Sequence, residues 1–350
     1  MLPIVALSSF IIILGAYHVS RTRIRPTPSS DIVDNPSRDK LVAEAKALIA
    51  PVNPQQSMEG WRNLVKRGER CIDMFLPKRD VDFVGFMQSV TLCTLLAGFY
   101  DVDPELLSPL DIAFMTNALN HHLDRAFGPP DAGELSAMTR CIYRWINEEH
   151  TSRALEIILL AYQPMWHLAA VTLTYVNGDQ HMRNAFLDFS ENPTERQFRA
   201  YKVKEAKPSV EAIMKEVLLL HPLTYQTAPK SRLFWWKQLL YSPVETGDTH
   251  PETFNAMRFH PKQSRAHRVL SFAYDGLSEE WSLMVTALIV AKVIDNVDDV
   301  RFILTGNASD PSAVRDMRIC WNGWTIRKKE KDHLFPSPSS PPPPYINLIF

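Results

Sequence analysis

The sequence predicts a mainly α-helical body with a minor β element, preceded by one N-terminal transmembrane helix. Apolar residues recur at helical spacing through most of residues 39–330. Only the segment 319–326 carries a strong hairpin signal, with Asn322-Gly323 suited to a type I′ turn. Residues 2–19 form an uncharged, mostly apolar run that is just long enough to span a bilayer.

The predicted helices lie between polar or proline-containing segments. Residues 82–100 are apolar on nearly all sides, which predicts a buried helix. Ser209 and Ser278 stand where helix N-caps are expected. The helical pattern stops after Pro222 and returns at Ser278. The predicted helical ranges are 39–52, 82–100, 109–127, 134–147, 154–175, 209–220 and a last helix from Ser278, with another through Trp61, Leu64 and Val65.

Glycine is scarce, with 12 residues in 350, and this scarcity excludes several classes of enzyme. The closest pair is Gly128 and Gly133, so neither a G-x-G dinucleotide turn nor a G-x-S-x-G nucleophile elbow can occur. Glu134 follows that pair where a phosphate-binding loop needs lysine. Dinucleotide oxidoreductases, P-loop nucleoside triphosphatases and α/β-hydrolases are therefore disfavoured.

Net charge and cysteine content exclude further classes of partner and site. The net charge of −1 gives no reason to expect a nucleic acid partner. The four cysteines, at positions 71, 93, 141 and 320, form no C-x-x-C pair, which indicates isolated thiols in a reducing compartment. We therefore expect neither a disulfide framework nor a metal site.

The N-terminal segment predicts a membrane-anchored protein whose partner is the lipid bilayer through residues 2–19. Arg21, Arg23 and Arg25 follow the apolar run, which by the positive-inside rule places the body in the cytosol. We expect a single-pass protein on the cytosolic face of the endoplasmic reticulum, and a cleaved signal peptide is the alternative. The predicted organisation is an anchor (1–20), a basic and proline-containing hinge (21–38), the α-rich domain (39–330) and a disordered proline-rich tail (331–350).

Several segments occur in an order that is similar to a known family. They are ALEIILLAYQPMWHLAAVTL (154–173), ENPTERQF (191–198), SVEAIMKEVLLLHP (209–222), HPETFNAMRFHP (250–261) and SFAYDGL (271–277), followed by a helix. Over roughly residues 60–326 this order resembles the cytochrome P-450 (haem-thiolate) family, in particular fungal members of secondary-metabolite pathways. The resemblance implies a cytochrome P-450-like fold, truncated between the anchor and Trp61.

The resemblance also shows which motif positions differ. The family's haem-ligand loop has Gly, Arg and Cys where this chain has Asp275, Gly276 and Leu277. No cysteine lies between Cys141 and Cys320, whereas a haem-thiolate iron needs a cysteine ligand. We therefore expect no cofactor. Haem would be bound only if the protein is a genuine haem monooxygenase with another iron ligand, which is the alternative hypothesis.

Two further motifs are altered. In the family, the glutamate and arginine of an E-x-x-R motif and a later arginine form a buried charged triad. Here Glu216 and Arg258 remain and Leu219 replaces the middle arginine, so we expect Glu216 and Arg258 to pair directly. In the central helix, Gln163-Pro164 stands where the family has an acid or amide followed by a threonine that delivers protons to dioxygen.

These observations predict a membrane-anchored cytochrome P-450-like protein of natural-product biosynthesis that acts on or binds a hydrophobic small molecule, without haem-thiolate chemistry. Its role would be cyclase-like, accessory or inactive, with a membrane reductase or a pathway monooxygenase as a further partner. The candidate pocket residues are Tyr162, Gln163, Met165, Trp166 and Ala169, for which core packing is the competing interpretation. The alternatives are a genuine haem monooxygenase with another iron ligand and a mis-spliced gene model of one.

Overall fold

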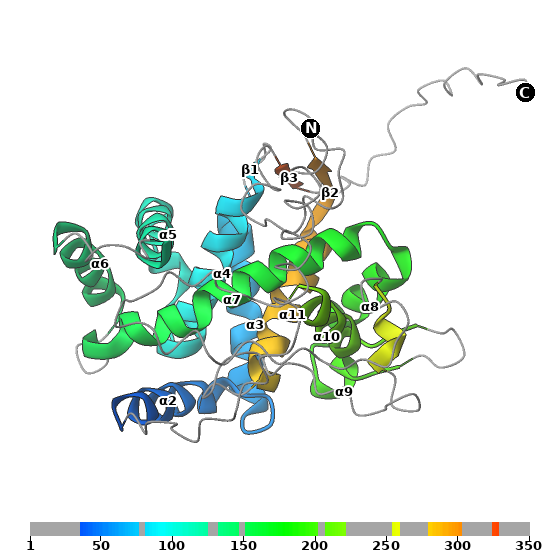
Figure 1. Ribbon diagram of the computed structural model, residues 1–350, viewed down its shortest axis with the longest axis horizontal. Helices are drawn as coiled ribbons and strands as arrows, with labels where there is room; N and C mark the ends of the chain where they lie inside the picture. Colours follow the sequence, from blue (N-terminus) through cyan, green and yellow to red (C-terminus); the bar gives the residue numbers. More distant parts are fainter. Residues whose placement is uncertain are drawn as a thin grey trace, which may run out of the picture. The chain divides into compact units, whose positions relative to one another are not determined.

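The body is built around four long helices. They are α3 (Met58–Phe75), α4 (Phe83–Tyr100), α7 (Thr151–Asn177) and α11 (Glu279–Asn296). α3 packs on α4, α4 on α7, α7 on α11, and α11 on α3, with α7 running across the middle of the group (Figure 1). All residues of α11 from 281 to 294 are buried, as are almost all residues of α4. These two helices therefore form the centre of the hydrophobic core.

The computed structural model describes residues 36–76, 81–124, 132–146, 151–201, 207–221, 254–259, 279–302 and 324–328. Those from Asp39 onward belong to one compact unit. The predicted N-terminal anchor, its hinge and the proline-rich tail lie outside the described residues.

Shorter helices cover the four-helix group. α5 (Pro109–Asp124) and α6 (Ala132–Trp145) run antiparallel. Asp111 near the start of α5 pairs with Arg144 near the end of α6 at 2.5 Å, and His121 pairs with Glu134 at 3.2 Å. The remaining helical elements are α2 (Pro36–Ile49), η1 (Ala50–Val52), η2 (Pro104–Leu106), α5 (Pro109–Asp124), α6 (Ala132–Trp145), α8 (Gln180–Glu191), α9 (Glu195–Phe198), α10 (Val210–Leu220) and η6 (Ala256–Phe259).

The prediction of a mainly helical body is confirmed, and the predicted helices match observed ones with small differences at their ends. α8 was not predicted, although Met182, Phe186 and Phe189 stand at helical spacing and are buried. Asp179 caps this helix by accepting hydrogen bonds from the backbone N–H groups of His181 and Met182.

A small antiparallel sheet is the observed β element. Its strands are β1 (Val81–Asp82), β2 (Val297–Phe302) and β3 (Trp324–Lys328), in the order β1-β3-β2. β1 leads directly into α4 and β2 follows directly from α11, so β3 ties the start of one core helix to the end of another. The ring of Trp324 also packs on Phe83, the first residue of α4.

The predicted hairpin across Asn322-Gly323 is wrong for the residues that follow the turn. Thr325 and Ile326 pair with β2 along one edge of β3 and with β1 along the other, so neither edge is open to residues just before the turn. Residues 303–323 lie outside the described ranges. The pairing observed here is between strands far apart in the sequence, and a local turn signal carries no information about such partners.

Two helices satisfy a length and hydropathy test for membrane spans, namely α4 and residues 153–177 of α7. In each, 83% of the most apolar window is buried inside the protein. Their hydrophobicity is thus used to build the core. Residues 2–19 are outside the described part of the chain, so this finding does not concern them.

Candidate functional site

A buried ion pair joins α10 to η6. The guanidinium of Arg258 donates to Glu216 Oε1 at 2.8 Å, and the backbone N–H of Asn255 donates to the same oxygen at 2.9 Å. Glu216 is 0% exposed and Arg258 is 5% exposed. The predicted direct pairing of Glu216 with Arg258 is therefore confirmed, and the backbone of Asn255 supplies a further donor.

Local sequence places Glu216 on the buried face of α10. Ser209 caps the helix by accepting from the backbone N–H of Ala212 at 3.2 Å. Ile213 and Val217 lie on the core side with Glu216, and all three are fully buried. Leu219, which stands at the position of the family's arginine, is only partly buried.

The segment 254–259 is held at both ends as well as at Arg258. The hydroxyl of Tyr201 donates to the carbonyl oxygen of Phe259 at 2.6 Å. At the other end, the ring of Phe254 stacks on Tyr175 with the ring centroids 4.8 Å apart. Contacts from α7, α10 and the chain after α9 thus fix a short segment that has little regular structure of its own.

A histidine–tyrosine pair lies beside this segment. The Tyr175 hydroxyl and His221 Nε2 are 2.8 Å apart and join the end of α7 to the end of α10. Burial lowers the pKa of His221, and burial together with the charge of Glu216 raises the pKa of Tyr175. Both groups are therefore neutral near pH 7, and the tautomer of the imidazole decides which of the two donates the hydrogen bond. Sequence reasoning missed this pair, because the two residues are 46 positions apart.

Charged side chains gather where α9, α10 and α11 begin or end. Arg199 pairs with Glu195 and Glu280, and its Nε lies 3.8 Å from Glu211. Gln55 donates to Glu280 at 2.6 Å. Burial raises the pKa of Glu280, an effect that Arg199 partly offsets. Burial also raises the pKa of the neighbouring Glu279. The arrangement connects helix ends on the outside of the core.

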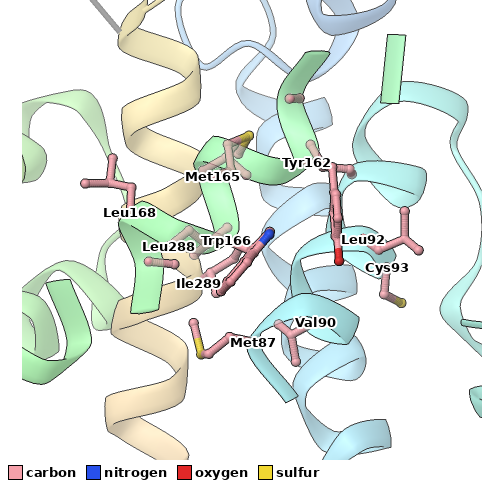
Figure 2. Packing of buried hydrophobic residues seen from close by; sticks show 14 of the residues in the cluster. Met87, Val90, Leu92, Cys93, Tyr162, Met165, Trp166, Leu168, Leu288 and Ile289 are labelled. Carbon is pink, nitrogen blue, oxygen red and sulfur yellow. The ribbon is translucent and has the colours of Figure 1, made fainter. Parts of the chain in front are cut away.

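The five candidate pocket residues all lie on α7 and are buried. Figure 2 shows Tyr162, Met165 and Trp166 of α7 among Met87, Val90, Leu92 and Cys93 of α4 and Leu288 and Ile289 of α11. Ala169, one helical turn further along, is also fully buried. In this structure the apolar surfaces of Tyr162, Met165, Trp166 and Ala169 therefore pack within the hydrophobic core.

Core packing does not account for two polar atoms in the same place. Gln163 is 6% exposed, and its Oε1 has no hydrogen-bond partner among the described residues. The fully buried Tyr162 hydroxyl approaches the side chain of Asn120 without forming a well-oriented hydrogen bond to any described residue. Burial raises the pKa of Tyr162 well above its usual value, and Asn120 opposes this shift. Buried polar atoms without partners are costly, and Thr91 of α4 and Ser282 of α11 also carry such atoms among the described residues.

The remaining altered motif positions fall in two places. Pro164 lies inside α7, where its ring removes one backbone hydrogen bond of the helix. Asp275, Gly276 and Leu277, which stand where the family has its haem-ligand loop, are outside the described residues.

The cysteines in the described ranges do not fit a haem-thiolate site. Cys71, Cys93 and Cys141 are buried in α3, α4 and α6, whereas the family's ligand cysteine stands in the sequence just before the helix that corresponds to α11. Burial raises the pKa of Cys141, which favours the neutral thiol over the thiolate that an iron ligand requires.

Comparison with known proteins gives no match: no family model fits the sequence, and no curated protein is similar to it.

Replacing Arg258 with alanine should leave the Glu216 carboxylate buried without its charged partner. We expect Arg258→Ala to lower the free energy of unfolding by about 3–5 kcal/mol, measured by urea denaturation. The double variant Glu216→Gln/Arg258→Met should recover part of this loss, because it leaves no buried charge. Arg196→Ala, which removes an exposed arginine on α9, is the matched control. An Arg258→Ala protein with the urea midpoint of the wild type would contradict the role given to this pair.

The depressed pKa of His221 predicts a pH dependence of stability. The folded protein holds His221 neutral, whereas the unfolded chain protonates it near its usual pKa. The contribution is therefore fully present above about pH 6.5 and is lost as the pH falls through the folded-state pKa. Thermal unfolding at about pH 8 and pH 5 should show a smaller loss of stability on acidification for His221→Gln than for the wild type. His181→Gln, an exposed histidine on α8, should behave as the wild type. Equal losses in all three proteins would refute the assignment.

Proposed function

We propose that this chain is a membrane-anchored, cytochrome P-450-like protein of a natural-product pathway that binds or transforms a hydrophobic small molecule without haem-thiolate chemistry. The observation that carries the proposal is the buried Glu216–Arg258 pair. It joins α10 to η6, and these are two of the segments on which the resemblance rests. Burying a charge pair at this depth costs desolvation free energy, and the presence of the pair therefore supports descent from that family.

The altered positions support the absence of haem-thiolate chemistry. Leu277 stands where the ligand cysteine is expected, and Pro164 stands where the family's threonine would deliver protons. Three changes affect three separate requirements: the iron ligand, the charged triad and the proton relay. A protein that kept the scaffold while losing all three is suited to binding or to a non-redox step.

The chemistry of α7 supports a ligand that is mostly apolar and carries a polar group. Tyr162, Met165 and Trp166 supply a large apolar and aromatic surface, while Gln163 supplies a buried amide oxygen without a partner among the described residues. A ligand hydroxyl or amine that donated to Gln163 Oε1 would satisfy that atom. For such a ligand to enter, the side chains that now fill the core must move apart.

The first test separates the proposal from a working monooxygenase. Microsomes from cells that express the full chain should show no Soret band that shifts on reduction with dithionite and addition of carbon monoxide. The reason is that the thiolate ligand of the haem is missing from the expected loop. Microsomes carrying an intact cytochrome P-450 are the positive control. A band that shifts with carbon monoxide would establish the alternative, a haem protein with another ligand.

The second test addresses the small molecule. Deleting the gene should change the profile of hydrophobic metabolites extracted from the source organism, and the wild-type gene should restore it. Gln163→Leu should fold but fail to restore the profile, because it removes the buried amide while keeping the apolar packing. Gln88→Leu, at another buried glutamine on α4, is the matched control and should restore it. A profile unaffected by deletion would argue for an inactive relic, and full restoration by Gln163→Leu would exclude the proposed binding point.

A further inference from the structure

Two cysteines that are far apart in the sequence lie together in the core. The scattered positions predict isolated thiols, but Cys71 of α3 and Cys93 of α4 are within hydrogen-bonding range of one another and both are 0% exposed. The prediction of isolated thiols is therefore wrong for this pair. Both cysteines are free thiols in the structure.

The contact between α3 and α4 explains why the thiols meet. Leu64 of α3 lies against Gly98 of α4, and Gly68 lies near Thr94, so the helices run antiparallel with a regular register. A Cβ atom at Gly98 would lie 3.4 Å from a methyl group of Leu64, which shows how closely the two helices approach. One turn beyond Gly68, the same register brings Cys71 to the turn of α4 that contains Cys93.

Close approach is the condition for a disulfide between helices. The Cα atoms of a disulfide are usually less than about 7 Å apart, whereas packed helix axes are normally about 8–10 Å apart. Gly68 and Gly98 remove side-chain bulk at this contact, and the cysteines are themselves small. The α3–α4 contact is thus built from the residue types that let two helices come close enough.

We propose that Cys71 and Cys93 form a dithiol site at the α3–α4 contact, which a small-molecule disulfide such as oxidised glutathione converts into an intramolecular disulfide. One cysteine thiolate attacks the reagent and releases one glutathione thiol, which gives a mixed disulfide. The second cysteine thiolate then attacks the protein sulfur of that bond and releases the second glutathione. Two protons and two electrons leave the cysteine pair, and the reagent is reduced to two thiols.

The site is slow to react while the core is closed. The hydrogen bond with Cys71, together with burial, raises the pKa of the Cys93 thiol, so the reactive thiolate is scarce at neutral pH. Reaction therefore needs a mildly alkaline solution or brief opening of the α3–α4 contact. Once formed, the disulfide would join two of the four core helices and restrict the unfolded chain.

The test uses the full chain in detergent, incubated with oxidised glutathione at mildly alkaline pH and a urea concentration below the unfolding transition. We expect a mass decrease equal to two hydrogen atoms and a proteolytic peptide pair linked through Cys71 and Cys93. The midpoint of thermal unfolding should rise by about 3–6 °C and return after dithiothreitol treatment. Cys141→Ala should behave as the wild type, whereas Cys71→Ala and Cys93→Ala should lose the linked pair.

Two results would overturn the proposal. One is a product that carries only mixed glutathione adducts at Cys71 or Cys93, with no link between them. The other is a link from either residue to Cys141 or Cys320. Because Cys71→Ala or Cys93→Ala could weaken the core, the peptide map of the wild type is decisive by itself.

Discussion

Two helices of this protein, α4 and α11, carry apolar side chains in nearly every direction, and water solvates such surfaces poorly. Neither helix can lie at the surface, so each needs neighbours around most of its circumference. α3, α7 and α8 provide them, and β3 joins the start of α4 to the end of α11. The positions of the other elements follow from this requirement, because they cover what the four core helices leave open.

Placing a carboxylate inside such a body imposes a second constraint. Glu216 is fully buried, and an ionised group at that depth must meet opposite charge or hydrogen-bond donors. Arg258 and the backbone of Asn255 meet this need, and in doing so they bring a segment with little regular structure against α10. The charges around Arg199 are more exposed and so impose a weaker constraint. The buried pair organises this region, and the outer charges connect helix ends.

The sequence predicted those parts of the structure that depend on local patterns or on an ordered set of motifs. The core helices have unmistakable hydrophobic patterns, and Glu216 and Arg258 were matched through the motifs that contain them. The partners of β3, the Tyr175–His221 pair and the contact of Cys71 with Cys93 depend on which distant elements meet, and no local pattern encodes that. α8 is different, since the spacing of Met182, Phe186 and Phe189 is itself a local helical pattern.

Arg258 follows Glu216 by 42 positions, so their ion pair closes a long loop of chain. The entropy lost on closing a flexible loop grows only with the logarithm of its length, and doubling the length costs about 0.6 kcal/mol. That is a small fraction of what separating the two charges would cost. The entropic cost of closing this loop therefore depends little on its length, and the free energy of the contact is set by the two charges that close it.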